Sequence, residues 1–232
     1  VVVQTVRGRV FVLAGTGSNN TAEALSLTES AVKAGVDGCL LITPYYNRPS
    51  QEGLFLHYRA IANEVDAALV PYSIEGRTGV NMTPELVQRL TEACPNIVGI
   101  KEASGNLNQM SQIIRYAGPD FQLTSGDDSL TLPVLAIGGV GVISVLANIC
   151  PTAVSSMVSS FRNGNISHAR SLHYTFWNLT RALFVETNPV PVKTAMSLLG
   201  HCSPEVRLPL SPLLPPSLNK LQSAMKEIGL LH

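Results

Sequence analysis

The chain has 232 residues, and its 16 lysines and arginines balance its 16 aspartates and glutamates, so the formal net charge is zero. This balance, without any basic cluster, argues against a nucleic-acid-binding or membrane-surface protein. No uninterrupted apolar run approaches the ~20 residues that a membrane-spanning helix needs. Hydrophobic residues make up 45% of the chain, enough for one substantial core, and the length suits one domain or two small ones.

The cysteines and histidines give no sign of a metal or redox site. The four cysteines lie far apart and none forms a C-x-x-C pair, and the five histidines show no H-E-x-x-H spacing. We therefore predict reduced thiols in an intracellular protein, with no zinc site.

Short apolar, β-branched runs recur along the chain, each followed by a turn and a helical stretch. The runs are nearly continuous in apolar residues, as expected of parallel strands that are covered on both faces. The predicted strands span residues 10–14, 39–43, 68–72, 97–101, 121–125 and 140–145.

Helix signals fill the gaps between these strands and the last third of the chain. We expect Thr21 to cap the first long helix and Gly35 to follow its end, and Pro84 opens another helix at the first helical position. We expect the pair Pro215-Pro216 to break the final helix. The predicted helices span residues 22–34, 49–65, 85–93, 155–161, 166–183, 191–199 and 213–228.

The alternation of strand and helix predicts an α/β fold with six strand–helix units. Strand ends recur about every 28 residues, close to the ~30 residues of a βαβ unit. Six strands fit a doubly wound sheet, whereas a (β/α)8 barrel would need two more, so the strand count leaves both architectures open.

The carboxyl ends of the strands carry the candidate chemistry, since α/β barrels collect their functional side chains there. Lys101 ends an apolar strand; the ordinary interpretation is a solvated lysine, and the alternative is a partly desolvated amine nucleophile. Taken singly, the other strand-end residues are also ordinary. Asp127-Asp128 is typical of a helix N-cap, and Arg77 is typical of a solvated turn.

Taken together, these side chains suit one kind of substrate. An amine (Lys101), two phenols (Tyr46 and Tyr72) and a guanidinium (Arg77) would face one mouth of the fold. Such a set fits a carbonyl compound that bears a carboxylate: the lysine condenses with the carbonyl, a phenol relays protons, and the arginine binds the carboxylate.

Several motifs, in this order and spacing, resemble the dihydrodipicolinate synthase family, also called 4-hydroxy-tetrahydrodipicolinate synthases, within the pyruvate-dependent class I aldolases. The sequence after Lys101 favours this family over the related N-acetylneuraminate lyases. The motifs are Ala14-Gly15-Thr16-Gly17, Thr43-Pro44-Tyr45-Tyr46-Asn47-Arg48-Pro49, Arg77-Thr78-Gly79, Gly99-Ile100-Lys101-Glu102-Ala103, Ser125-Gly126-Asp127-Asp128, Gly141-Val142-Ile143-Ser144-Val145 and Asn188-Pro189-Val190-Pro191-Val192-Lys193.

The resemblance implies a reaction and a role for individual residues. Lys101 matches the lysine that forms a Schiff base with pyruvate, after which the enamine attacks aspartate semialdehyde, a step of lysine and diaminopimelate biosynthesis. Tyr72 matches the proton-relay tyrosine, and Tyr46 the tyrosine that a neighbouring subunit lends to the relay. Arg77 matches the arginine that binds the semialdehyde carboxylate. Gly126 and the carbonyl of Ile143 match positions that line the pyruvate site.

The resemblance also implies properties beyond the reaction. Members of the family use no cofactor or metal and are usually homotetramers, built as dimers of tight dimers, in the cytoplasm or, in plants, in plastids. Asn19, Glu23 and Tyr45 match residues that bind free lysine in feedback-inhibited members; for Glu23 the competing interpretation is a first-turn helix glutamate that the helix dipole stabilises.

The implied fold is a (β/α)8 TIM barrel with a C-terminal helical domain. The family's first two strands, with a threonine-containing segment that links the two tyrosines, have no counterpart in the sequence, so we expect a barrel over residues 1–163 that lacks those strands, and a closing helix and helical domain over 164–232. A chain without those strands should expose two sheet edges and lose activity. Two alternatives remain open: a sister pyruvate aldolase with another acceptor, and a catalytically inactive relative that binds small carboxylates.

Overall fold

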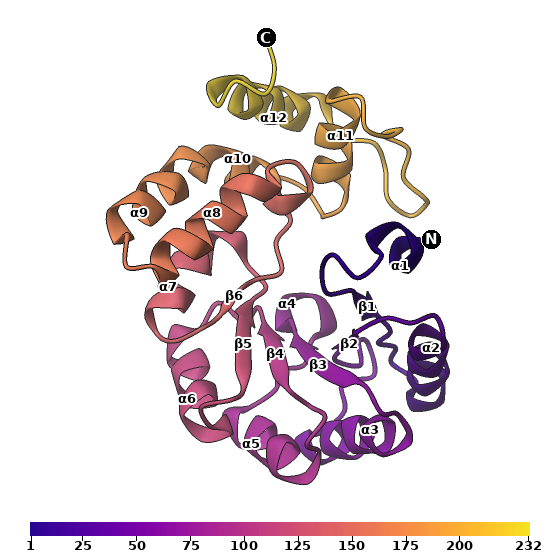
Figure 1. Cartoon of the computed structure of the whole chain (residues 1–232). Coiled ribbons are helices and arrows are strands. Elements are labelled where there is room, and N and C mark those ends of the chain that lie inside the picture. The colour runs from indigo at the N-terminus through magenta and orange to yellow at the C-terminus, as the bar shows by residue number, and fades with distance from the viewer. The chain divides into compact units, whose positions relative to one another are not determined.

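The computed structural model describes all 232 residues and divides into two compact units (Figure 1). The first unit comprises Val1–Gly126 and Ala136–Val142, and the second comprises Asp127–Leu135 and Ile143–His232. The first holds the sheet, and the second is helical.

The first unit is built on one parallel sheet whose six strands pair in the order of the sequence. The α/β class and the six strands are therefore confirmed. Because β1 and β6 pair only with β2 and β5, they form the two edges of the sheet. The strands are β1 (Leu13–Gly15), β2 (Gly38–Ile42), β3 (Ala68–Ser73), β4 (Gly99–Glu102), β5 (Gln122–Ser125) and β6 (Gly141–Val142).

Helices connect consecutive strands of this sheet and pack beside one another along one of its faces (Figure 1). The long ones are α2, α3, α5 and α6, and the short α4 follows β3 directly. The helices of the first unit are α1 (Val2–Val6), α2 (Thr21–Lys33), α3 (Gln51–Glu64), α4 (Glu75–Thr78), α5 (Pro84–Ala93) and α6 (Leu107–Ala117).

Burial alternates along the strands and separates a covered face from an open face. The side chains on the helix-covered face are buried: Cys39, Leu41, Leu69, Ile100 and Leu123. The residues between them, which point to the other face, are only half-buried. This period of two places residues that are adjacent in sequence on opposite sides of the sheet.

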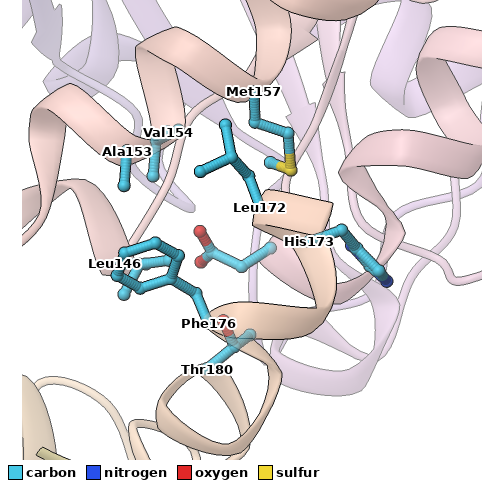
Figure 2. Close-up of a pocket in the computed structure, with 9 residues that line it drawn as sticks. Leu146, Ala153, Val154, Met157, Leu172, His173, Phe176 and Thr180 are labelled. Atoms are coloured by element: carbon cyan, nitrogen blue, oxygen red, sulfur yellow. The ribbon is translucent and has the colours of Figure 1, made fainter. Parts of the chain in front are cut away.

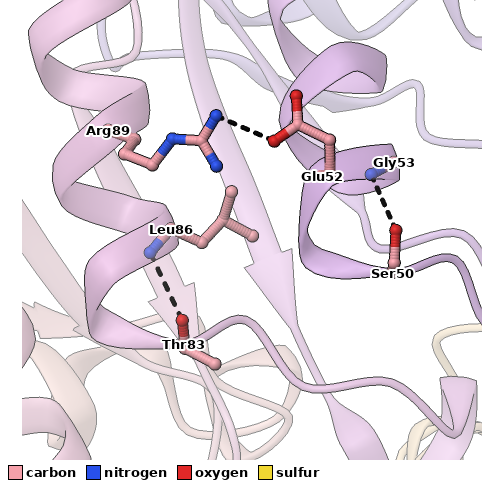
Figure 3. Close-up of polar contacts among 6 residues, drawn as sticks. All are labelled: Ser50, Glu52, Gly53, Thr83, Leu86 and Arg89. Carbon is pink, nitrogen blue, oxygen red and sulfur yellow. Dashed lines mark hydrogen bonds and ion pairs between the residues drawn. The ribbon is translucent and has the colours of Figure 1, made fainter.

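Side-chain caps start the helices α3 and α5, and one ion pair joins them (Figure 3). The Ser50 hydroxyl accepts the Gly53 N–H at 3.2 Å, and the Thr83 hydroxyl accepts the Leu86 N–H at 3.3 Å. Arg89 pairs with Glu52 at 2.9 Å, on a surface where such a pair contributes little to stability. The helices therefore owe their positions mainly to the apolar side chains beneath them.

The second unit is helical around its own small core, which includes the fully buried Ala169, Leu179, Leu183, Leu221 and Met225. The elements of the second unit are the 3-10 helices η1 (Asp128–Leu130) and η2 (Leu146–Asn148) and the α-helices α7 (Thr131–Ala136), α8 (Pro151–Arg162), α9 (Ile166–Thr175), α10 (Trp177–Ala182), α11 (Val190–Leu198) and α12 (Pro215–Glu227). Of these residues, only Ala136, the last residue of α7, belongs to the first unit.

Three sequence predictions about element ends were wrong. Asn20, not Thr21, caps α2 by accepting the Glu23 N–H, while the Thr21 hydroxyl bonds to the His57 ring. The pair Pro215-Pro216 starts α12 instead of breaking it, because proline fits the first helical turn. The predicted helix 166–183 is two helices, α9 and α10, separated at Phe176.

The edge strands are shorter than predicted: β1 covers three residues and β6 only two.

No helix combines the length and the apolar character that a membrane crossing requires. The predicted division of the chain at residue 163 stays a prediction.

Candidate active site

Two of the predicted site residues, Lys101 and Tyr72, lie side by side on the open face of the sheet. They are register partners at the carboxyl ends of β4 and β3. The Lys101 Nζ lies 4.0 Å from the centroid of the Tyr72 ring, within the range of a cation–π contact. Both side chains are half-buried. The strand end therefore holds the amine against an aromatic surface.

Gly126 lies under the side chain of Lys101. A Cβ at this position would come within 2.7 Å of the Ala103 Cβ, closer than real Cβ atoms approach, and within 3.0 Å of the Lys101 Cε, a tight contact. The Gly126 N–H also donates to the Glu102 carbonyl at 2.7 Å, which extends the pairing of β5 with β4 past the last strand residue. Only glycine therefore lets the lysine stem cross this position.

Arg77 reaches the same end of the sheet from α4, which follows β3. Burial raises the pKa of Tyr72, and the positive charge of Arg77 partly opposes this. At neutral pH the phenol therefore stays protonated, as a proton donor requires. The Thr78 hydroxyl fixes the turn by sharing its one proton between the carbonyls of Ile74 and Val80, both at 3.1 Å, and Gly79 ends the turn at φ 76°.

Tyr46 does not join Lys101 and Tyr72 within the chain. Its side chain is 91% exposed, and its backbone has φ 73°, a conformation that is uncommon for a residue with a Cβ. The Asn47 N–H donates to the Tyr45 carbonyl at 2.9 Å, which closes a tight turn around it. Strained backbone of this kind clusters at functional sites.

The three residues predicted to bind lysine form a polar cluster at the start of α2. The Asn19 side-chain amide donates to the Tyr45 carbonyl at 3.1 Å, and the Ser18 hydroxyl donates to the Glu23 carboxylate. The side chain of Asn47 returns a bond to the Asn19 carbonyl at 2.9 Å. The cluster thus joins the start of α2 to the loop that carries Tyr46.

Ile143 belongs to the second unit, one residue past β6. The turn that follows it is held by Asp128, whose carboxylate accepts the Ser144 hydroxyl and, at 2.8 Å, the Val145 N–H. Burial raises the pKa of Asp128, and the bond from Ser144 opposes this. Asp127 caps η1 by accepting the Ser129 N–H, as the sequence predicted for this pair.

A small cavity lies beside Asp128 in the second unit. Its volume of about 10 Å3 has room for about one water molecule, so it is too small for a substrate. Figure 2 shows that it is lined mainly by apolar side chains of η2, α8 and α9. The lining residues are Asp128, Leu146, Ala153, Val154, Met157, Leu172, His173, Phe176 and Thr180.

Sequence reasoning missed Glu102 as an individual residue, although it follows Lys101 directly. Glu102 is fully buried on the covered face and accepts the Gln109 side-chain amide at 2.8 Å and the Ser104 N–H at 3.2 Å. Burial raises the pKa of Glu102, and the bonds from Ser104 and Gln109 oppose this. The signal that could have found it was the strict alternation of the strand, which puts Lys101 and Glu102 on opposite faces.

The model of the dihydrodipicolinate synthetase family matches residues 1–228. The chain belongs to this family. A protein of Geobacter sp. (strain M21) named 4-hydroxy-tetrahydrodipicolinate synthase is 54% identical over 231 residues, which cover all of this chain and 79% of that protein.

Solved structures of the family have the same fold. The 4-hydroxy-tetrahydrodipicolinate synthase from Methylacidiphilum fumariolicum SolV superposes with a TM-score of 0.96 at 49% identity, over 97% of this chain and 75% of that one. The synthase from Cyanidioschyzon merolae with lysine bound gives a TM-score of 0.95 at 45% identity, over 99% and 78% of the two chains.

Proposed function

We propose that this protein condenses pyruvate with aspartate semialdehyde to 4-hydroxy-tetrahydrodipicolinate, with Lys101 as the Schiff-base lysine. Family membership along residues 1–228 supports the reaction. The observation that carries the assignment of Lys101 is its geometry: the stem crosses Gly126 and the amine lies 4.0 Å from the centre of the Tyr72 ring.

The proposed reaction begins with attack of the Lys101 amine on the keto carbon of pyruvate, and loss of water gives the imine. Removal of a proton from the pyruvate methyl group turns the imine into an enamine. The enamine carbon then bonds to the aldehyde carbon of the semialdehyde, whose oxygen takes up a proton. Formation of this bond turns the enamine back into an imine of Lys101. The acceptor's own amine then attacks the imine carbon, which closes the ring and breaks the bond to the Lys101 nitrogen.

Tyr72 is the proposed proton carrier at this site, because its phenol is kept protonated beside the amine. Arg77, exposed on α4 and close enough to lower the pKa of Tyr72, is the proposed partner of the semialdehyde carboxylate. Gly126 and the Ile143 carbonyl are the proposed lining of the pyruvate site.

Borohydride reduction in the presence of pyruvate tests the central assignment. The adduct should appear on Lys101 by peptide mass spectrometry, and Lys101→Arg should abolish both trapping and turnover, because a guanidinium stays protonated and does not condense. Lys193→Arg is the control and should leave trapping intact. An adduct on Lys193 or Lys33 in the wild-type protein would contradict the proposal.

The acceptor aldehyde is a separate part of the proposal. Lys101 and the fold would serve a sister pyruvate aldolase equally well. Turnover should be fastest with aspartate semialdehyde in a screen of aldehydes with and without a carboxylate. If another aldehyde reacts faster, that aldehyde becomes the proposed acceptor in place of aspartate semialdehyde, and the proposed Schiff-base step does not change. Trapping without turnover on any aldehyde would instead support an inactive, pyruvate-binding relative.

We further propose that Tyr46 acts in a neighbouring subunit, within a homotetramer built from tight dimers. Its high exposure and left-handed backbone support this, since the ring has little packing in its own chain. Mixed dimers of the inactive variants Tyr46→Phe and Tyr72→Phe should regain part of the activity, because one of their sites holds both phenols. If co-expression restores nothing, Tyr46 does not act across the interface.

Free lysine is the proposed regulatory ligand of the cluster formed by Asn19, Glu23 and Tyr45. The structure of the Cyanidioschyzon merolae synthase was determined with lysine bound, which supports the same ligand here. Initial rates should fall as lysine rises to millimolar concentration, and Glu23→Ala should flatten the curve. A flat curve for the wild-type protein would remove the idea.

For the architecture, we propose that the six strands are six of the eight strands of a (β/α)8 barrel. The sequential parallel order of the sheet and the high TM-scores support this. The proposed helical domain begins after residue 163.

A further inference from the structure

A second row of polar side chains crosses the sheet directly behind the candidate catalytic residues. Thr43, Ser73, Glu102 and Ser125 stand at the carboxyl ends of four neighbouring strands, on the covered face, and all four are fully inaccessible to solvent. Ser73 is the register partner of Glu102, and Glu102 of Ser125. A buried polar row is unfavourable unless hydrogen bonds satisfy it, so its partners matter.

The partners of this row form a continuous chain of hydrogen bonds from β4 to β3. Gln109 on α6 donates to Glu102 at 2.8 Å. Gln109 and Asn81 exchange two amide bonds, of 2.7 and 3.1 Å. The Ser73 hydroxyl donates to the side-chain Oδ1 of Asn81 at 3.3 Å and accepts the Met82 N–H at 3.3 Å. We call Glu102, Gln109, Asn81 and Ser73 the amide relay.

The acceptor role of Glu102 sets the direction of this relay. Both of its oxygens accept, one from the Ser104 N–H and the other from Gln109, so Gln109 turns its NH2 group toward Glu102. The carbonyl oxygen of Gln109 then faces the NH2 group of Asn81, which leaves the Asn81 oxygen for the Ser73 hydroxyl. One carboxylate therefore fixes the orientation of both amides.

The relay lies beside a backbone ladder that is shorter than the ladders on either side of it. The ladder between β3 and β4 has only the pairs Tyr72 with Lys101 and Ser73 with Glu102, apart from an isolated bridge nearer the other end. On either side, β2 pairs with β3 and β4 with β5 along whole strands. The two residues proposed for the chemistry therefore sit on a ladder with fewer register pairs than either neighbouring ladder.

We infer that Glu102, acting through Gln109 and Asn81, is a positioning residue that holds the Lys101 amine in place over the Tyr72 ring. Lys101 and Tyr72 each precede one end of the relay by one residue, on the opposite face. Fixing Glu102 and Ser73 therefore fixes both backbones. This inference rests on the proposed role of Lys101. Small displacements of a reacting group can lower a rate by about 100-fold, so the role has a measurable consequence.

Glu102→Gln tests the inference by reversing the polarity of one bond with almost no change in volume. If the new carboxamide accepts the Ser104 N–H with its oxygen, its NH2 group opposes the NH2 group of Gln109. The rate of borohydride trapping with saturating pyruvate and kcat should both fall by roughly 10- to 100-fold, while KM for pyruvate changes by less than about 3-fold.

The swap Glu102→Gln with Gln109→Glu is the matched rescue. It places a donor on β4 and an acceptor on α6, so the bond between them re-forms in the opposite sense. Trapping and kcat should recover to within about 5-fold of the wild-type protein. If Glu102→Gln does not fold, Gln109→Met tests the same link, since it removes the amide and keeps the carboxylate; trapping should slow by about 10-fold or more.

Thr28→Val controls for a purely structural role. Thr28 is fully buried and its hydroxyl bonds to Thr16 and Ala24, away from the relay. It should lower the melting temperature and leave the trapping rate unchanged. If Glu102→Gln changes only the melting temperature, as this control does, or changes nothing, the inference is overturned. If the wild-type adduct forms on another lysine, the proposed function fails first, and the two failures are distinct.

Discussion

The two faces of the sheet in the first unit differ in solvent access and in what their side chains bond to. The open face carries Tyr72, Lys101 and, in register beside them, Thr124, all half-buried. The covered face carries Ser73 and Glu102, which no solvent reaches. The first set is available to a substrate, and the second is bonded within the protein. Changes on the open face should therefore affect the reaction more than the stability, and changes on the covered face should affect stability or geometry.

The strongest test on the open face is Gly126→Ala. The new methyl group would overlap Ala103 and the Lys101 stem, at 2.7 and 3.0 Å, and the lysine must move because the glycine backbone is held by its bond to Glu102. Turnover and borohydride trapping should fall by about 100-fold. Overpacking should lower the free energy of unfolding by only about 1–3 kcal/mol.

Gly105→Ala is the matched control for this change. Gly105 follows β4 and has φ 79°, and a methyl group on its Cα would meet no atom within 4 Å, so alanine strains the backbone without touching the lysine. It should cost about 1 kcal/mol of stability and leave trapping near the wild-type rate. Equal losses of trapping in the two variants would mean that the strand-end loops, and not the lysine stem, limit the reaction.

On the covered side, His57 makes stability depend on pH. It lies in α3, its Nδ1 is 2.9 Å from the Thr21 hydroxyl, and its buried Nε2 has no hydrogen-bond partner. Burial lowers the pKa of His57 to about 4, against 6.5 for an unperturbed histidine. The unfolded chain therefore binds the proton more tightly, and the stability present above pH 6.5 is lost as the pH falls toward 4.

Between pH 7 and pH 5 this histidine should remove about 2 kcal/mol of stability. Denaturant unfolding at both pH values measures it, with His57→Asn as the reference, because the asparagine amide can replace Nδ1 and does not titrate. Glu102 and Asp128 oppose the trend, since a raised carboxyl pKa favours the folded state as the pH falls. The contribution of His57 is the loss of unfolding free energy between pH 7 and pH 5 in the wild-type protein minus the same loss in His57→Asn. Equal losses in the two proteins would show that His57 is hydrated in the fold.

The strands of the fold were readable in sequence because apolar side chains occupy most positions on both faces of the sheet and so form nearly continuous runs. Their ends were less readable. The run at residues 140–145 predicted a six-residue strand, yet β6 stops at Val142, and Asp128 holds the following turn by accepting the Ser144 hydroxyl and the Val145 N–H. The proline pair that opens α12 was misread because sequence alone does not say whether prolines end a helix or begin one.

The site divides in the same way. Lys101 and Tyr72 could be proposed from their strand ends, and the structure places them together. Glu102 was missed because a charged residue after a strand-end lysine looks solvated, although the alternation of the strand points it to the face opposite Lys101. Its partner Gln109 lies in α6, and Asn81, which bonds to Gln109, lies 28 residues earlier in the loop between α4 and α5, so only the fold brings them together.

The smallest effect should come from Thr43→Val, at the β2 end of the covered row. The Thr43 hydroxyl donates to the Thr78 hydroxyl at 3.1 Å, and Thr78 fixes the turn that carries Arg77. Losing one such bond should cost about 1 kcal/mol of stability. The turn should loosen without moving Lys101, so KM for the aldehyde should rise about 2- to 5-fold while kcat and the trapping rate stay unchanged. Thr28→Val is the control: it should lose a comparable amount of stability, but because Thr28 has no link to Arg77, KM for the aldehyde should not change. A fall in trapping for Thr43→Val would show that the covered row acts as one unit, and that the separation between Thr43 and the amide relay does not hold.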